Sequence, residues 1–234
     1  MNVFIVHAHN EPQSFCTAML HRMVQRFQAQ GHEVHVSDLY AMQFNPVASA
    51  ADFQARSNPD YLVYALEQRN ADKTGTLAPD IAAEVAKLKA CDLLVLNFPL
   101  YWFSLPAILK GWIDRVFLSG VVYGGRNFYD RGLLKGKKAL LTFSLGGREH
   151  MFGPGSIHGD LNAMLKPVLQ GSLGYAGMQV LEPFAAYHVP YITHEARVEV
   201  LEALDACVDG LETRAVLPKP SLDDFDPQMN PINS

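Results

Sequence analysis

The most constraining feature of this 234-residue chain is an alternation between short apolar runs and longer segments with helical spacing. Five apolar runs have the length of strands: 2–7, 33–39, 92–98, 138–144 and 178–187. The segments with helical spacing or helix-capping residues lie at 15–30, 79–90, 106–117, 160–173 and 193–211. Strands that alternate with helices are typical of a parallel sheet that is covered on both faces. The pattern therefore predicts an α/β fold with a doubly wound, five-stranded parallel sheet.

Three segments depart from this regular alternation. Residues 40–78 are irregular and long for a connection, which indicates a functional excursion. Pro167 should kink or divide the helix predicted at 160–173. Residues 215–234 carry four prolines and little pattern. We predict one domain at 1–214, followed by an extended C-terminal tail at 215–234.

Charge and composition exclude several classes of function. The formal net charge is −5 and the basic residues are scattered along the sequence, so a nucleic-acid partner is not expected. No apolar run approaches the roughly 20 residues of a membrane helix, and the N-terminus has no basic leader, so membrane insertion and secretion are not expected. The three cysteines are far apart, which favours a reducing cytoplasm, and none has the spacing of a metal site.

The ligand site is expected at the carboxyl ends of the strands, where doubly wound sheets bind their ligands. The loop at 7–14 leads into a helix, whose first N–H groups form an anion site. Ser14 can cap this helix or donate to a phosphate, and His9 can also donate to a phosphate oxygen. The loop has neither a Walker A motif nor GxGxxG, so a plain helix cap with an unrelated histidine remains an alternative. A metal pair of His7 and His9 lacks a third ligand.

Two further loops at the same edge carry aromatic residues and glycines. Tyr101, Trp102 and Phe103 follow the third strand, and three aromatic residues in succession cannot all point into the core. Gly146 and Gly147 follow the fourth strand, where a missing Cβ lets the backbone approach a ligand. Together with the predicted anion site, these loops indicate a planar heteroaromatic ligand with a phosphate-bearing chain, such as a flavin.

At this point the chain resembles a known family, the flavodoxin-like NAD(P)H:quinone oxidoreductases of the DT-diaphorase group. The resemblance rests on five stretches: AHNEPQSF (8–15), SDLYAMQFNP (37–46), FPLYWFSLPAILKGWIDRVF (98–117), GGREHMFGPGSIHGD (146–160) and QVLEP (179–183). It implies a flavodoxin-like sheet with strand order 2-1-3-4-5. It also implies a homodimer with flavin sites at the subunit interface. In that family NAD(P)H reduces the flavin, and a quinone then accepts two electrons by a ping-pong mechanism.

The resemblance also assigns residues. The cofactor positions are His9, Ser14, Phe15, Pro99, Leu100, Tyr101, Trp102, Phe103, Ser144, Leu145, Gly146, Gly147 and Arg197. The substrate pocket would be bordered by Trp102, Phe103, Tyr123, Phe152, His158 and Tyr175. His158 would be the catalytic residue that stabilises charge during hydride transfer. Arg197 would lie near adenosine, so it and the long 40–78 excursion favour FAD, with FMN as the alternative.

Two departures from the family pattern bear on mechanism. Phe152 stands where many relatives have a tyrosine, so His158 would act alone or with water. Gly174 stands where a metal-binding variant has a histidine, so no metal is expected. Two alternative functions stay open: reduction of azo or nitro compounds on the same scaffold, and a regulatory subunit of a potassium-efflux transporter. A serine hydrolase is disfavoured because no GxSxG motif occurs.

Overall fold

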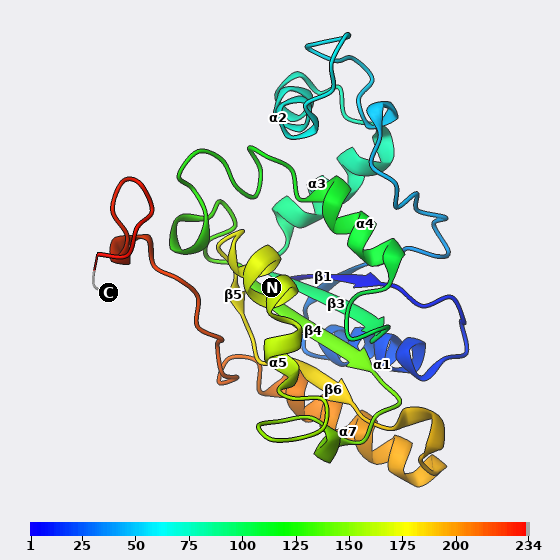
Figure 1. The fold of residues 1–234 in the computed structure, drawn as a ribbon. Helices are drawn as coiled ribbons and strands as arrows, with labels where there is room; N and C mark the ends of the chain where they lie inside the picture. The colour runs from blue at the N-terminus through cyan, green and yellow to red at the C-terminus, as the bar shows by residue number, and fades with distance from the viewer. Residues whose placement is uncertain (233–234) are drawn as a thin grey trace.

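The structure, a computed structural model, describes residues 1–232 and contains the predicted parallel sheet (Figure 1). The strands are β1 (Asn2–His7), β2 (Glu33–Asp38), β3 (Leu93–Pro99), β4 (Lys138–Ser144), β5 (Gln179–Val180) and β6 (Phe184–Ala186). Their order is β2-β1-β3-β4-β5, and β6 pairs with β4 beyond the end of β5. The prediction of a doubly wound parallel sheet with order 2-1-3-4-5 is thus confirmed, with one extra strand.

The extra strand arises because the predicted fifth strand is divided. Leu181 still donates its backbone N–H to Ala139, but Pro183 has no N–H to offer. The chain therefore leaves the ladder after Val180 and rejoins it at Phe184. The prediction of one continuous strand at 178–187 was wrong for this reason.

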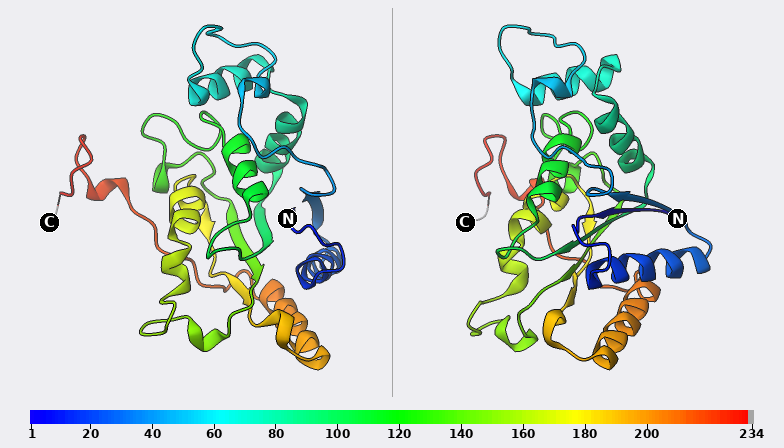
Figure 2. Two further views of the ribbon diagram at one scale, coloured as in Figure 1. Left: turned by 45° about the vertical axis from the view of Figure 1, so that its right-hand side comes forward. Right: turned by 90° about the vertical axis from the view of Figure 1, so that its right-hand side faces the viewer.

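Helices cover both faces of the sheet (Figure 2). Helices α1 (Phe15–Ala29) and α7 (His194–Asp209) pack on one face, against Val3 and Ile5 of β1. Helices α3 (Pro79–Ala90) and α4 (Ala107–Val116) pack on the other, against Phe4 and Val6. Because successive side chains of a strand point to opposite faces, one apolar run supplies two cores.

The excursion at 40–78 contains an unpredicted helix, α2 (Tyr64–Thr74), which ends at Gly75 in the left-handed conformation with φ 68°. Arg115 of α4 holds the excursion to the sheet domain. Its guanidinium is 3% exposed and binds the carboxylates of Asp52 at 2.9 Å and Asp80 at 2.8 Å. It also donates to the backbone oxygen of Asn45. These long-range contacts have no signature in local spacing.

The helix predicted at 160–173 is divided, as the proline suggested. Its parts are α5 (Leu161–Met164), α6 (Lys166–Val168) and a π-helical segment, η4 (Leu169–Gly174). The break falls at Leu165, two residues before Pro167. None of the helices in residues 1–232 combines the length and apolar character needed to span a membrane.

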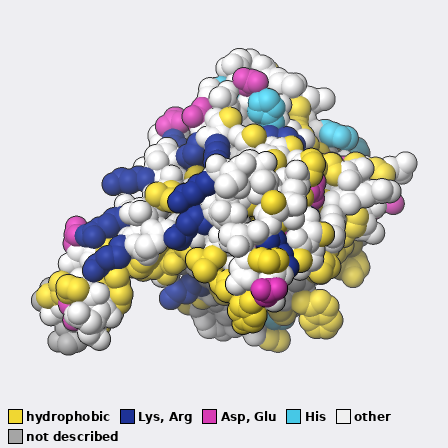
Figure 3. All heavy atoms as spheres, turned by 90° about the horizontal axis from the view of Figure 1, so that it is seen from above, with side chains coloured by type: hydrophobic (Ala, Val, Ile, Leu, Met, Phe, Trp, Pro, Cys, Tyr) yellow, Lys and Arg dark blue, Asp and Glu magenta, His cyan; other side chains and the backbone are white. Residues whose placement is uncertain are grey.

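The C-terminal segment starts along the outer edge of β5 and then leaves the body of the domain (Figures 1 and 2). Leu181 and Val216 form an antiparallel bridge, and Leu222 donates its backbone N–H to Asp130. Residues 233–234 of the predicted tail lie outside the described residues. Seen from above, Lys and Arg side chains gather on the side of the molecule that carries this segment (Figure 3), although they are scattered in the sequence.

Candidate active site

A cleft of about 560 Å³ opens at the carboxyl edge of the sheet. The loops after β1, β3 and β4 and the start of α7 contribute its walls. Ten of the predicted cofactor residues line it: His9, Ser14, Phe15, Pro99, Leu100, Tyr101, Ser144, Leu145, Gly146 and Arg197. The structure therefore brings together residues from three loops and from the first turns of α1 and α7, which are far apart in sequence.

Five other residues also line the cleft, and none of them is among the predicted cofactor residues: Gln13, Cys16, Ala18, Val189 and Pro190. Val189 and Pro190 follow β6, at the carboxyl end of the predicted fifth strand. The prediction from sequence covered only the loops after the first, third and fourth strands, so it missed this one. Burial raises the pKa of the Cys16 thiol to about 12, which keeps it protonated. Gln13 lies within the first loop itself, and Ala18 lies about one helical turn beyond it in α1.

The first loop and α1 form the anion-binding end of the cleft. Ser14 is the N-cap of α1, and its Oγ accepts from the backbone N–H of Thr17 at 3.1 Å. The backbone N–H of Glu11 donates to Nδ1 of His9 at 2.9 Å, so the proton of the neutral ring is on Nε2. Burial lowers the pKa of His9, partly offset by Glu11, which favours this neutral form. With the free N–H groups of the helix end, the arrangement suits a phosphate.

The aromatic stretch after β3 forms a tight, strained turn. Tyr101 and Ser104 exchange two backbone hydrogen bonds, of 3.1 and 2.9 Å. The two residues between them have positive φ, 50° at Trp102 and 58° at Phe103. Bulky residues rarely adopt this conformation, which costs about 1–3 kcal/mol per residue and is found most often at functional sites. Tyr101 lines the cleft, whereas Trp102 and Phe103 do not, and the Trp102 side chain is 95% exposed.

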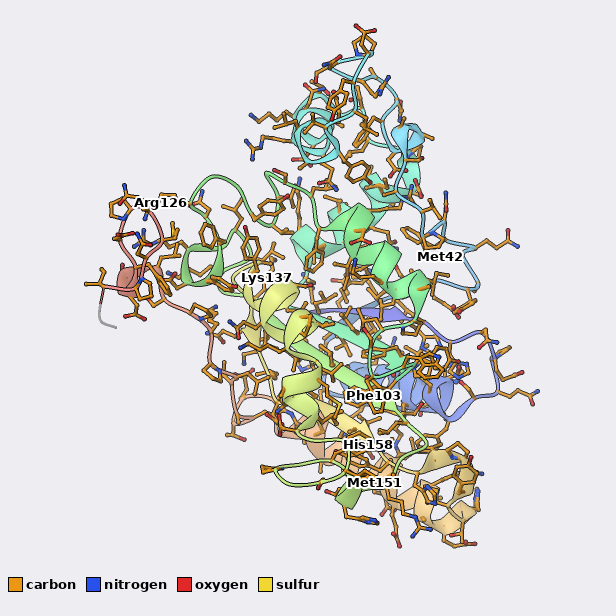
Figure 4. The ribbon with its side chains drawn as sticks, in the orientation of Figure 1. Met42, Phe103, Arg126, Lys137, Met151 and His158 are labelled. Atoms are coloured by element: carbon orange, nitrogen blue, oxygen red, sulfur yellow. The ribbon has the colours of Figure 1, made fainter. Side chains whose placement is uncertain are left out.

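His158 lies between two aromatic rings outside the cleft. Its ring centroid is 5.2 Å from that of Phe103 and 5.1 Å from that of Phe152. The backbone N–H of His158 donates to the oxygen of Met151, which holds the loop in place. Phe103, His158 and Met151 lie close together in Figure 4. The structure thus joins the predicted catalytic histidine to the aromatic turn.

The two predicted glycines after β4 have different environments. A Cβ at Gly146 would meet only the edge of Tyr191, at 3.9 Å, so this backbone faces open space in the cleft. A Cβ at Gly147 would lie 2.8 Å from the ring of Phe152. Gly147 does not line the cleft. Its lack of a side chain makes room for Phe152, a requirement that the sequence did not reveal.

Tyr123 and Tyr175 lie in a separate aromatic group. Their ring centroids are 5.6 Å apart, and Phe128 stacks on Tyr175 at 5.2 Å. They line a groove of about 370 Å³ beside α2 and α4, not the cleft. Arg126, in the same loop as Tyr123, lies well apart from His158 in Figure 4. One chain therefore does not bring all six predicted substrate residues together.

The remaining cofactor residue, Arg197, lies in the first turn of α7. Its guanidinium donates to the backbone oxygen of Val189 at 3.2 Å. This contact holds the chain after β6 against α7 and forms one end of the cleft. The cleft thus continues from the anion-binding loop to the cationic side chain of Arg197.

Comparisons with known proteins agree with this architecture. The family described as having a flavodoxin-like fold matches residues 1–208. NAD(P)H dehydrogenase (quinone) 1 of Rattus norvegicus is 44% identical over 199 residues, which cover 85% of this chain and 73% of the relative. Ribosyldihydronicotinamide dehydrogenase (quinone) of Homo sapiens is 41% identical over 202 residues, which cover 86% and 87%.

A solved structure from Klebsiella pneumoniae, described as a quinone reductase, superposes with a TM-score of 0.91. It is 32% identical in sequence, and the match covers 99% of this chain and 94% of that one. The similarity therefore extends over the whole sheet domain.

Proposed function

The chain belongs to the family with the flavodoxin-like fold, and from that premise we propose that it is a flavin-dependent NAD(P)H dehydrogenase that reduces quinones. The observation that carries the proposal is the cleft. It combines a helix N-terminus with His9 and Ser14, an open backbone edge at Gly146 and a wall of Pro99 to Tyr101. Relatives that match some 85% of the chain are dehydrogenases of the quinone type.

The residues present fit a flavin nucleotide. His9, Ser14 and the first N–H groups of α1 would hold its phosphates. The wall of Pro99 to Tyr101 would contact the ring, and the backbone from Ser144 to Gly146 would approach its polar edge. The cleft continues from this end to Pro190 and Arg197. That extension supports FAD over FMN, because FAD carries an adenosine beyond its phosphates.

A bound flavin would supply the two-electron chemistry that links a reduced nicotinamide to a quinone. The residues of this chain would position the reactants and stabilise charge. We assign to His158 the stabilisation of negative charge at the polar edge of the ring, through a ring N–H. Phe152 offers no hydroxyl beside it, so His158 acts alone or with water. Trp102 and Phe103 present apolar faces on which a flat substrate can stack.

We further propose that the chain works as a homodimer in which a second copy completes the site. The catalytic group around His158 and the aromatic group around Tyr175 are separate on one chain. Trp102 stands almost fully exposed beside the first group, as expected of a surface that a second subunit covers. In the dimer, Tyr123 and Tyr175 of one subunit would border the substrate pocket of the other.

The test begins with the purified protein. We expect a yellow protein whose chromophore, released by mild denaturation, has the mass of FAD. Initial rates with NADH or NADPH and a quinone should give the parallel double-reciprocal lines of a ping-pong mechanism. A panel of quinones, azo dyes and nitro compounds at equal concentration ranks the acceptors. A colourless protein that binds neither FAD nor FMN would refute the proposal.

A further inference from the structure

A row of buried polar side chains lies beneath the anion-binding end of the cleft. His7 ends β1 and is 1% exposed, Asn97 of β3 is fully buried, and Thr17 of α1 is 6% exposed. None of the three lines the cleft, but hydrogen bonds connect them to Ser14, which does. The row therefore reaches a cofactor position from inside the core.

The row has a definite donor direction at its buried end. Asn97 Nδ2 donates to the backbone oxygen of Cys16 at 3.0 Å, which fixes the orientation of the amide. The same nitrogen donates to Nδ1 of His7 at 2.9 Å. Because Nδ1 accepts, the proton of the neutral ring is on Nε2. Burial lowers the pKa of His7 to about 4, so the ring is neutral near pH 7.

From His7 the row continues to two hydroxyl groups. Nε2 of His7 donates to Thr17 Oγ1 at 3.2 Å. The same Thr17 oxygen lies 2.9 Å from Ser14 Oγ and 3.1 Å from the backbone oxygen of Glu11. Thr17 has a single hydroxyl proton, so it donates either to Glu11 or to Ser14.

These two arrangements differ in what Ser14 can do. When Thr17 donates to Glu11, the Ser14 hydroxyl donates back to Thr17 and offers no proton to the cleft. When Thr17 donates to Ser14, the proton of Ser14 is free to turn toward the cleft. In this second arrangement Thr17 Oγ1 no longer accepts from Ser14, and His7 supplies the hydrogen that this buried oxygen needs.

Building on the proposed flavin site, we propose that His7 and Thr17 are positioning residues that turn the Ser14 hydroxyl toward the cleft, where it donates to a phosphate oxygen of the flavin nucleotide. Asn97 fixes the tautomer of His7 that makes this possible. Neither positioning residue touches the ligand. Their effect should therefore be confined to ligands that carry a phosphate.

A matched pair of variants tests the role of His7. The glutamine of His7→Gln can place an amide N–H where Nε2 stands, whereas the shorter asparagine of His7→Asn cannot. Flavin-free protein is titrated with FAD and with riboflavin, which lacks phosphate, and the quenching of flavin fluorescence gives each Kd. We expect His7→Asn to weaken FAD binding about tenfold, the effect of about one lost hydrogen bond, and to leave riboflavin binding unchanged. His7→Gln should restore most of the FAD affinity.

Thr17 provides a second, independent pair of variants, which tests the proposal even if the variants at His7 fail to fold. Thr17→Val removes the hydroxyl at nearly constant shape, and Thr17→Ser keeps it. Thr17→Val should weaken FAD binding in the wild-type background but have little effect in Ser14→Ala, because Thr17 acts through Ser14. The ³¹P NMR signal of bound FAD should shift in Thr17→Val and not in Thr17→Ser.

The outcomes separate this proposal from the proposed function. If the wild-type protein binds FAD and riboflavin but the variants weaken both equally, or weaken neither, the positioning role is wrong while the flavin site stands. Additive effects of Thr17→Val and Ser14→Ala would also contradict it. If the wild-type protein binds no flavin at all, the proposed function itself fails.

Discussion

At the scale of single residues, two histidines near the cleft are placed for different work. His158 is half-buried between Phe103 and Phe152, outside the cleft, where a ring N–H can reach a reactant. His7 is buried beneath the cleft and bonded on both ring nitrogens. The position of His158 suits a residue that stabilises charge developing on a reactant. The position of His7 suits a residue that maintains a fixed hydrogen-bond geometry. Each leads to a prediction of its own.

Removing the imidazole of His158 should slow the reaction without loss of flavin. We expect His158→Ala to reduce the rate of flavin reduction by NAD(P)H about a hundredfold, because a group that stabilises developing charge is lost. Flavin content should not change, since His158 does not line the cleft. Stopped-flow absorbance measures the rate, and His158→Gln, which retains an N–H, should recover part of it. A wild-type rate in His158→Ala would remove this role.

Restoring a hydroxyl next to His158 should have the opposite effect. The ring of Phe152 lies against both His158 and Gly147, so a phenol at this position would stand beside the catalytic group. We expect Phe152→Tyr to raise the rate of flavin reduction about tenfold, the order of effect of one added donor. Phe152→Leu, which adds no hydroxyl, is the control. Equal rates in the tyrosine variant and the wild type would show that the hydroxyl is dispensable.

His7 should make stability depend on pH. Burial lowers its pKa from an ordinary value of 6.5 to about 4, while Asp38 raises it and His9 and His21 lower it. Between these values the unfolded chain binds a proton that the folded chain does not, so stability is full above pH 6.5 and falls as the pH falls. The loss at His7 should reach about 3 kcal/mol near pH 4.

Urea unfolding of the wild type and of His7→Leu, at about pH 7 and about pH 4.5, measures this contribution. The wild type should lose more stability than His7→Leu over this interval, because the variant has no imidazole to protonate. His194→Leu is the control, since His194 is exposed at the start of α7 and is not among the groups that shift the pKa of His7. An equal loss in wild type and His7→Leu would mean that the pKa of His7 is the same in the folded and the unfolded chain.

At the scale of elements, the turn after β3 stores backbone strain. Trp102 and Phe103 both have positive φ, and the exposed Trp102 side chain gains little from packing. Such strain persists where the geometry serves a ligand. The π-helical segment η4 and the divided fifth strand are further irregular elements. Tyr175 follows η4 directly, and the chain after β6 leads into Val189. The irregular elements of this fold therefore coincide with the residues assigned to its sites.

Relieving the backbone strain at Trp102 should stabilise the fold, while loss of the indole should raise the KM for the quinone. Asparagine tolerates positive φ, so Trp102→Asn should raise the free energy of unfolding of the flavin-free protein by about 1 kcal/mol. Trp102→Ala removes the same indole without relieving the strain and is the matched control. Both variants should raise the KM for the quinone, because the stacking surface is lost. Equal stability of the two variants would show that the turn is not strained.

At the scale of the whole molecule, the two aromatic groups make the dimer testable. Each proposed site takes His158 from one subunit and Tyr175 from the other. A heterodimer of a His158→Ala chain and a Tyr175→Ala chain would then contain one intact site and one doubly altered site. We expect each homodimeric variant to be impaired and the heterodimer to recover about half of the wild-type activity.

Two different affinity tags allow the heterodimer to be purified away from the homodimers. A mixture of the two homodimers that have not exchanged subunits is the control. If the purified heterodimer is no more active than this mixture, all residues of a site come from one chain. Sedimentation of the wild type as a monomer would lead to the same conclusion.

Much of the fold and part of the site followed from local pattern. The apolar runs and helical stripes predicted β1, β3, β4, α1 and α3 to within a residue or two, because period and capping are properties of neighbouring residues. The rule that ligands bind at the carboxyl edge then placed His9, Ser14, Tyr101 and Gly146 in one cleft. The division at residue 214, the cofactor and the roles of the site residues stay predictions.

Spacing along the chain was enough to predict β1 to β4, the loops that share their carboxyl edge and the residue types that face a ligand, because period and capping are local properties. Three features came from long-range packing instead: Gly147 makes room for Phe152, Arg115 anchors the excursion, and Tyr123 and Tyr175 lie away from His158. The tertiary structure alone revealed the row from His7 to Ser14. These contacts join residues from different elements, and local spacing carries no record of which side chains meet across a sheet.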